Sequence, residues 1–386
     1  MRLAERMDRI PPSGTIRMAE LARKMEREGK KVLHLEVGEP DFDTPEHIKE
    51  AAYEAIRSGF THYTSSRGIL ELREAVSEYM KTKGVDVDPE REILITPGTK
   101  HAIYCGCLAA INPGDEVLIM SPIWTTFYVC VRAAGGRPIE VKYGEGFTLK
   151  EETVKDLITG NTRMVILNSP NNPTGQVAKR EALKLIADLA IDNDLLVLSD
   201  EIYDRFVYDG ERASSIASFD GMKERTLTVN GLSKTYAMTG WRLGYAVANE
   251  EWIEAMMRIQ QNTTTCPPSF VQKAGVVALR GPQDCVDEML RAYEKRRKLI
   301  FERLNRISGV KCQRPMGAFY VFPDFSSFGR DSSELVFGML DSKGICATPG
   351  TAFGDCGKGH IRFSYATSLD VIEEAMNRLE EYVAEL

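Results

Sequence analysis

The sequence lacks long hydrophobic runs, blocks of basic residues and a dense set of cysteines. Its apolar runs, such as Leu195–Leu198, are far shorter than the ~20 residues that a membrane-spanning helix needs. The net charge is −7, so the composition gives no reason to expect nucleic acid or an anionic membrane as a partner. Met1 to Arg9 are charged and contain no apolar signal core, which predicts a cytoplasmic protein.

Scarce cysteine and missing motifs exclude further classes. Eight cysteines in 386 residues are too few for a disulfide framework, and their spacing matches no zinc pattern, so no metal site is expected. Cys105 and Cys107 lie in the apolar helical stretch His101–Ile111, where packed core thiols are a simpler interpretation than a metal or redox pair. No G-x-G-x-x-G follows a predicted strand, which argues against a nicotinamide-dependent dehydrogenase.

What the chain does contain, between residues 48 and 282, is a series of strand-then-helix units. Helical stretches such as Lys179–Asp192 separate several short apolar runs. The predicted strands are Ile93–Thr96, Val117–Met120, Met164–Asn168, Leu195–Ser199, Leu227–Asn230 and Tyr245–Ala248. Apolar strands that alternate with helices predict an α/β domain with a largely parallel sheet covered on both faces. Ligands bind such sheets at the carboxyl ends of the strands.

The last hundred residues follow a different pattern. Asp284–Leu304 is a long charged helical stretch, and short strands are predicted at Phe319–Phe322 and Ile361–Tyr365. A final helix is predicted at Leu369–Leu386. We therefore expect a large domain of residues 48–282 and a smaller α+β domain formed by 1–47 and 283–386, because the first residues have no core of their own.

Three motifs follow predicted strands at the expected ligand-binding edge. Gly98-Thr99-Lys100-His101 opens a helix, where free backbone N–H groups suit a phosphate, although Gly-Thr also serves turn geometry alone. The prolines of SPNNPTG (169–175) aim an asparagine rigidly from a strand end, or the motif caps the next helix. In SDEIY (199–203), a buried Asp200 needs a cationic partner such as a pyridinium N–H, with a helix N-cap as the alternative.

The stretch GLSKTYAMTGWR (231–242) is the most informative. It joins two predicted strands and holds Lys234 and Arg242 among small and apolar residues. A lysine in such surroundings is hard to explain as a solvated surface charge, and it suits an amine that condenses with an aldehyde. Arg242 offers a planar donor fork that suits a phosphate dianion.

In this order, SPNNPTG, SDEIY and SKTYAMTGWRLGY resemble the class I aminotransferases of the pyridoxal-phosphate (PLP) fold type I. The similarity covers essentially the whole chain and includes VGEPDFDTP (Val37–Pro45), HYTSSRGILELREA (His62–Ala75), PGTAFG and IRFSYA. The chain looks closest to aspartate and aromatic aminotransferases of archaea and bacteria. The resemblance implies a mostly parallel seven-stranded sheet between helices, a smaller α+β domain, and a homodimer with its active site at the interface.

The resemblance also implies a role for individual residues. Lys234 would bind PLP covalently and act as the base, Asp200 would pair with the protonated ring nitrogen, and Tyr203 would hydrogen-bond the ring's phenolic oxygen. The other cofactor contacts would come from Gly98, Thr99, Lys100, Trp124, Asn172, Ser233, Arg242 and, on the neighbouring subunit, Tyr63. The substrate contacts would come from Gly38, Trp124, Asn172 and Arg362, of which Arg362 would bind the α-carboxylate.

The implied activity is transfer of an amino group from an L-amino acid, such as aspartate or an aromatic amino acid, to a 2-oxo acid such as 2-oxoglutarate, in a ping-pong cycle. A PLP-dependent β- or γ-lyase shares Lys234, Asp200 and Tyr203 and is the alternative. A non-catalytic effector-binding module would need an extra helix-turn-helix region, for which the match leaves no room. Ile10 to Ile16, expected to line the side-chain pocket, is mostly apolar with two hydroxyls, Ser13 and Thr15, and does not decide between acidic and aromatic substrates.

Overall fold

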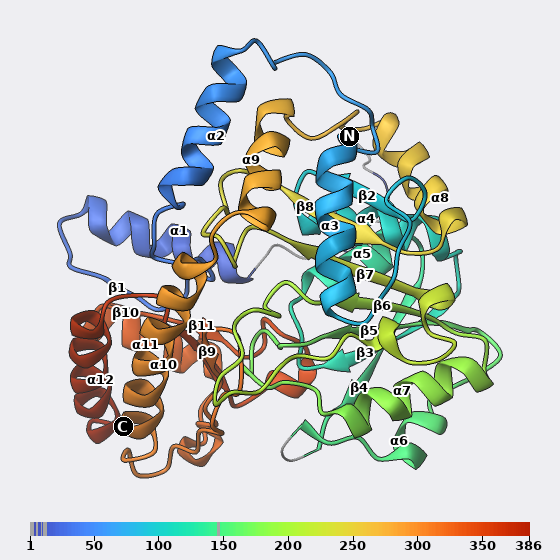
Figure 1. The fold of residues 1–386 in the computed structure, drawn as a ribbon. Helices are drawn as coiled ribbons and strands as arrows, with labels where there is room; N and C mark the ends of the chain where they lie inside the picture. The colour runs from blue at the N-terminus through green and yellow to red at the C-terminus, as the bar shows by residue number, and fades with distance from the viewer. Residues whose placement is uncertain (1–3, 5–6, 9, 11–13, 145–146) are drawn as a thin grey trace.

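The computed structural model describes residues 4, 7–8, 10, 14–144 and 147–386. Its largest sheet has seven strands in the order β2-β8-β7-β6-β5-β3-β4 (Figure 1). The strands are β2 (Ile93–Thr96), β3 (Glu116–Ser121), β4 (Arg137–Lys142), β5 (Thr162–Asn168), β6 (Leu196–Asp200), β7 (Thr226–Gly231) and β8 (Gly244–Val247). Only β8 runs antiparallel to its neighbours in this sheet. This confirms the predicted α/β class with a mostly parallel seven-stranded sheet.

One strand of this sheet, β4, was not predicted from the sequence. It lies at the edge of the sheet beside β3 and begins with Arg137-Pro138. Most of its residues are partly or fully exposed. An edge strand can carry polar residues because one side of it faces water, so β4 lacks the continuous apolar run that marks the central strands.

Helices cover both faces of the sheet, and alternate strand residues face opposite sides. Val117 and Ile119 pack in one core with residues of α4, α5 and α8, whereas Leu118 and Met120 pack in another with residues of α6 and α7. A third core joins α2, α3 and α9 to β2 and β8. The helices are α2 (Glu46–Arg57), α3 (Leu70–Thr82), α4 (Thr99–Ala110), α5 (Thr126–Ala133), α6 (Glu151–Lys155), α7 (Arg180–Asp192), α8 (Glu250–Gln261) and α9 (Ser269–Arg280). Cys105 and Cys107 are buried thiols of α4, as expected.

The two chain ends share one hydrophobic core, seen at the lower left of Figure 1. There β1 (Leu33–His34) pairs with β10 (Ile345–Cys346), and β11 (Thr348–Pro349), β12 (Ile361–Ser364) and β9 (Tyr320–Val321) form an antiparallel sheet. The surrounding helices are α1 (Gly14–Arg27), α10 (Asp284–Leu304), α11 (Ser332–Lys343) and α12 (Leu369–Ala384). We propose on this basis that 1–47 and 283–386 form the small domain and 48–282 the large one.

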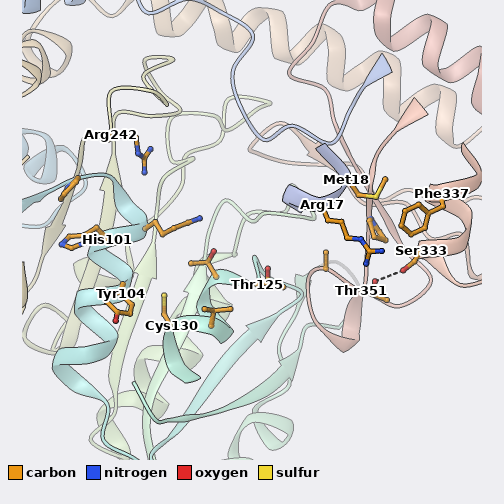
Figure 2. Close-up of a pocket in the computed structure, with 16 residues that line it drawn as sticks. Arg17, Met18, His101, Tyr104, Thr125, Cys130, Arg242, Ser333, Phe337 and Thr351 are labelled. Atoms are coloured by element: carbon orange, nitrogen blue, oxygen red, sulfur yellow. Dashed lines mark hydrogen bonds between the residues drawn. The ribbon is translucent and has the colours of Figure 1, made fainter. Parts of the chain in front are cut away.

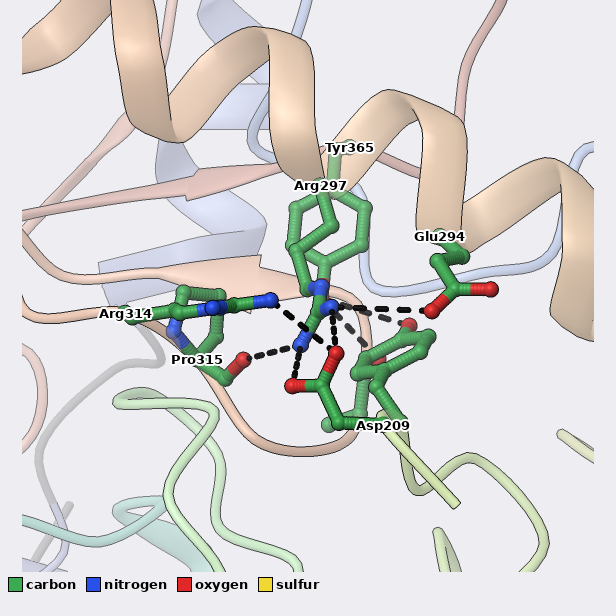
Figure 3. A network of polar contacts seen from close by, with 8 residues as sticks. Asp209, Glu294, Arg297, Arg314, Pro315 and Tyr365 are labelled. Carbon is green, nitrogen blue, oxygen red and sulfur yellow. Dashed lines mark hydrogen bonds and ion pairs between the residues drawn. The ribbon is translucent and has the colours of Figure 1, made fainter.

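An ion pair between the buried Arg297 and the partly exposed Asp209 fastens the segment after β6 to α10 (Figure 3). Arg297 donates to both carboxylate oxygens of Asp209, at 2.8 and 3.0 Å, and to the Pro315 carbonyl at 3.0 Å. Arg314 reaches the same carboxylate at 3.0 Å. The segment that follows Asp200 is therefore held at its far end by the small domain.

Within the described residues, no helix is long and apolar enough to cross a membrane.

Candidate active site

A cavity of about 340 Å³ lies at the carboxyl ends of β5, β6 and β7, against the small-domain strands β9 and β12. Most residues singled out in the sequence line this cavity: Gly38, Thr99, Lys100, Trp124, Asn172, Asp200, Tyr203, Ser233, Lys234, Arg242 and Arg362. Tyr63 is not among the lining residues, and its side chain is 88% exposed. Gly98 is not a lining residue either, although it lies against Arg242, which is. The structure thus gathers the other predicted residues in one place and leaves Tyr63 at the surface.

Lys234 follows β7 and presents its amine to the cavity. The Nζ atom donates a hydrogen bond to the carbonyl oxygen of Gly38. Loss of water around the amine lowers the pKa of Lys234 to about 8, and the nearby guanidinium groups of Arg362 and Arg242 also lower it. A lysine with this pKa is partly neutral at mildly alkaline pH, so it can attack a carbonyl carbon or accept a proton.

Asp200 ends β6 and is buried at the floor of the cavity. Burial raises the pKa of Asp200 to about 7, opposed by the backbone N–H of Ile202 and by the charge of Lys234. The Ile202 N–H donates to one carboxylate oxygen at 3.1 Å. A buried carboxylate is stabilised by a cationic hydrogen-bond donor, and a protonated pyridine nitrogen is such a donor.

Arg362, on β12, has a donor without a partner. Its Nη1 donates to Asn172 Oδ1 at 2.9 Å, and its Nη2 donates to the Glu36 carbonyl and to Thr348. Its Nε is buried without a partner, and no carboxylate of the described residues pairs with the guanidinium. A buried N–H without an acceptor is costly. A ligand carboxylate would supply the acceptor.

Gly98 and Arg242 shape an anion cradle at the start of α4. Gly98 has φ +82°, and a Cβ at this position would lie 2.5 Å from Arg242 Nη2. Thr99 is the first residue of α4, so the free N–H groups of the helix end and the Thr99 hydroxyl lie beside the guanidinium. Ser233 lines the same cavity. This donor set fits the phosphate of PLP, just as Asp200 and Lys234 fit its ring nitrogen and its aldehyde.

Lys100 is a further cation in the cavity. Its Nζ lies 4.7 Å from the centroid of the Trp124 ring. Burial lowers the pKa of Lys100, and the charge of Arg242 lowers it further. No carboxylate of the described residues pairs with Lys100 in the structure. A partly buried, unpaired ammonium beside an aromatic ring suits an anionic or aromatic ligand group.

A second cavity, of about 800 Å³, adjoins the first (Figure 2). Lys100 and Arg242 line both cavities, so the second is an antechamber of the site. Figure 2 shows Arg17 and Phe337 on one wall and His101 of α4 on the other. The lining described for the antechamber includes no aspartate or glutamate. Such a lining attracts anionic molecules toward the site.

Eight lining residues were not named as site residues from the sequence: Ala19, Arg23, Glu36, Val37, Asn168, Ile202, Thr239 and Tyr320. Asn168 directly precedes the SPNNPTG motif, so its place at a strand end was a usable signal. Glu36 and Tyr320 come from the small domain and carry no motif of their own. Of the segment Ile10 to Ile16, residues 11–13, including Ser13, lie outside the described part of the chain, as does the Thr15 side chain.

Comparison with known proteins identifies the family. The family model for aminotransferase class I and II matches residues 30–379. The chain is 46% identical to aromatic-amino-acid aminotransferase 2 of Thermococcus litoralis, over 100% of this chain and 99% of that one. It is 44% identical to an aspartate aminotransferase of Pyrococcus abyssi, with the same coverage. A solved structure of Thermus thermophilus aspartate aminotransferase with maleate has a TM-score of 0.94 and 41% identity, and the match covers 99% of this chain and 100% of that one.

The chain belongs to the class I and II aminotransferases. It is a PLP-dependent transaminase of fold type I, which confirms the resemblance seen in the sequence. Its substrates are therefore amino acids and 2-oxo acids. The relatives named above are aminotransferases, so the lyase alternative gains no support.

Proposed function

We propose that this aminotransferase moves the amino group of an acidic or aromatic L-amino acid to a 2-oxo acid such as 2-oxoglutarate, in a ping-pong cycle with PLP carried on Lys234. The observation that carries the proposal is the convergence of three groups on one cavity. These are the amine of Lys234, the buried carboxylate of Asp200 and the incompletely paired guanidinium of Arg362.

The cofactor is held by groups around its ring and its phosphate. When bound, PLP supplies an electron sink for the bond that breaks at the substrate Cα. Asp200 would pair with the protonated ring nitrogen, Tyr203 and Asn172 would hydrogen-bond the ring oxygen, and Trp124 would contact the ring. The phosphate would be held by Gly98, Thr99, Ser233 and Arg242, which leaves the Lys100 ammonium for the substrate.

Two residues act directly on the substrate. Arg362, beside the Gly38 backbone, binds the α-carboxylate, which gives its unpaired Nε an acceptor. Lys234 Nζ would accept the proton that leaves the substrate Cα and would hold it for return to the reacting group. Its lowered pKa makes it neutral often enough to accept that proton.

The proposed choice of substrate rests on the positive charges that line the antechamber and the site. Among the described residues, Lys100 has no carboxylate partner, and the antechamber lining contains Arg17 and Arg242 but no acidic side chain. These cations favour a dicarboxylate, and the Thermus relative was solved with maleate. The apolar Phe337 and the ring of Trp124 suit an aromatic side chain, as does the likeness to the aromatic enzyme of Thermococcus litoralis.

A homodimer completes the proposal. Tyr63 is 88% exposed, which suits a side chain that reaches the phosphate site of a second copy. If so, Tyr63→Phe weakens PLP binding about tenfold, the loss expected for one hydrogen bond to a charged group. Light scattering of the holoenzyme checks the oligomeric state. A monomer with full activity would contradict the dimer. The cytoplasmic location stays a prediction.

The test of the activity is the absorbance spectrum of the holoenzyme, recorded before and after single amino acids are added without any oxo acid. A visible band that converts stoichiometrically to the pyridoxamine form, with release of the matching oxo acid, supports transamination and ranks the donors. A band that persists while ammonia accumulates contradicts it. Lys234→Ala is the control, since this variant should form no lysine-linked band.

The role of Lys100 has its own matched variant. Lys100→Met keeps the length of the side chain and its contact with Trp124 but removes the charge. We expect kcat/KM for aspartate to fall at least about tenfold, because a charged hydrogen bond contributes about 1.5–3 kcal/mol. The value for phenylalanine should change less. An equal loss for both donors would contradict a role in reading the side-chain carboxylate.

A further inference from the structure

Tyr320, on β9, lies where several groups of the active site meet. Its side chain is buried, and its hydroxyl oxygen lies 2.8 Å from that of Tyr203. The Arg362 guanidinium lies over its ring, 4.6 Å from the centroid. Gly38 makes room for the hydroxyl, because a Cβ there would lie 2.5 Å from it. Tyr320 therefore touches the tyrosine, the arginine and the glycine to which the site assigns separate tasks.

The surroundings set the direction of the hydrogen bond between the two tyrosines. Burial raises the pKa of both phenols. For Tyr320, the charge of the Arg362 guanidinium is the largest effect that lowers the pKa again. For Tyr203, the neighbouring Tyr320 raises the pKa further. Either hydroxyl could donate this hydrogen bond. The Arg362 guanidinium lies over the Tyr320 ring and makes Tyr320 the more acidic phenol, which favours Tyr320 as donor and Tyr203 as acceptor. The proton of Tyr203 is then free to point into the cavity.

We propose that Tyr320 is a positioning residue that, by donating a hydrogen bond to Tyr203, aims the Tyr203 hydroxyl at the PLP ring oxygen and strengthens that contact. The inference rests on the proposed role of Tyr203. Hydrogen bonds in a chain polarise one another, which strengthens each by roughly 10–30%. Since β9 belongs to the small domain, the contact also joins the substrate-binding side of the cavity to the cofactor-binding side.

The expected consequence is a change in a proton equilibrium of the bound cofactor. A stronger hydrogen bond from Tyr203 withdraws negative charge from the ring oxygen. The ring oxygen then attracts less strongly the proton that it shares with the Lys234 nitrogen. Removing the Tyr320 hydroxyl reverses this effect. We expect the pH midpoint of the visible absorption to rise by about 0.3 unit, from 10–30% of a charged hydrogen bond.

The experiment is a pH titration of the visible spectrum of the holoenzyme and three variants: Tyr320→Phe, Tyr203→Phe and the double variant. Tyr320→Phe should raise the midpoint by about 0.3 pH unit. In the Tyr203→Phe background the same change should have no further effect, because the hydroxyl through which Tyr320 acts is gone. Tyr293→Phe is the matched control, since its buried hydroxyl has no partner, and it should leave the midpoint unchanged.

Two outcomes overturn the inference: no shift in Tyr320→Phe, or an equal shift in the presence and absence of the Tyr203 hydroxyl. A wild-type protein without a titrating visible band would instead overturn the proposed function, so the two failures are distinguishable. Gly38→Ala covers the case in which Tyr320→Phe does not fold, because its Cβ displaces the Tyr320 hydroxyl. Because the Gly38 carbonyl also accepts a hydrogen bond from Lys234, Gly38→Ala is compared with and without the Tyr203 hydroxyl. Its rise in the midpoint should vanish in the Tyr203→Phe background, and an equal rise there, or no rise in either background, would contradict the inference.

Discussion

Replacing Asp209 with asparagine removes the charge that holds the buried guanidinium of Arg297 (Figure 3). The Arg297 side chain is 4% exposed, makes two hydrogen bonds to the carboxylate and lies 4.4 Å over the Tyr208 ring. Asparagine has nearly the same size as aspartate but carries no charge and one acceptor oxygen. The variant therefore leaves a buried cation with fewer acceptors, which is costly in a dry environment.

The magnitude follows from what Arg297 keeps. Breaking a buried pair by removing one partner costs about 3–5 kcal/mol. Arg297 retains the Pro315 carbonyl at 3.0 Å and the Glu294 carboxylate at 3.7 Å, and the Asp209 side chain is 31% exposed, so we expect less than this range, about 2 kcal/mol. An unfolding entropy of about 2.1 cal/mol/K per residue gives about 0.8 kcal/mol/K for this chain. The midpoint of thermal unfolding should then fall by about 2.5 °C.

Thermal unfolding of the holoenzyme, followed by circular dichroism at neutral pH, measures this difference. Asp188→Asn is the matched control, because Asp188 pairs with Lys184 on the surface of α7, where both side chains are about half exposed. We expect that variant to lose less than about 0.5 kcal/mol. Equal midpoints of thermal unfolding for Asp209→Asn and Asp188→Asn would refute the reasoning.

The pH dependence gives a second check on the same variant. The hydrogen bonds from Arg297 lower the pKa of Asp209 below its ordinary value. A carboxylate with a lowered folded-state pKa contributes stability above its unfolded-state pKa and loses it as pH falls through the folded-state value. The difference between wild type and Asp209→Asn should therefore shrink below about pH 4. A constant difference down to pH 2 would contradict the ion-pair origin of the effect.

Three further predictions concern single residues. Arg362→Lys should lower kcat/KM about 100-fold for every donor, because an ammonium cannot offer two parallel donors to a carboxylate; steady-state kinetics with unchanged thermal stability would show it. Gly98→Ala should weaken PLP binding about tenfold or more, since its φ is +82° and its Cβ would meet Arg242, and titration of the apoenzyme with PLP measures this. The pKa of His34 is raised to about 9, mainly by its hydrogen bond to Glu36. The contribution of His34 to stability is therefore full below pH 6.5 and is lost as pH rises through about 9. In denaturant unfolding, His34→Gln should then cost stability at pH 6 and little at pH 10.

Local sequence patterns were enough to predict most of the large sheet. The central strands are buried on both faces, so each appears as a short apolar run, and β2 (Ile93–Thr96) matches its prediction at both ends. The same holds for α10 (Asp284–Leu304), where apolar residues recur at helical spacing. The edge strand β4 was not predicted because its exposed side tolerates polar residues. Local patterns therefore predict an element best where burial makes its residues uniform.

By itself, the sequence determined the fold class, through apolar strands that alternate with helices. It also determined the family and the candidate residues around Lys234 and Asp200, because these residues lie in short contiguous motifs at strand ends. Tertiary structure alone decided how groups distant in the chain meet. The unpaired Nε of Arg362, the hydrogen bond between Tyr320 and Tyr203 and the antechamber, whose described lining holds no acidic residue, all join residues from the two chain ends to the central sheet. Such contacts depend on packing between domains, which leaves no periodic or local signal in the sequence.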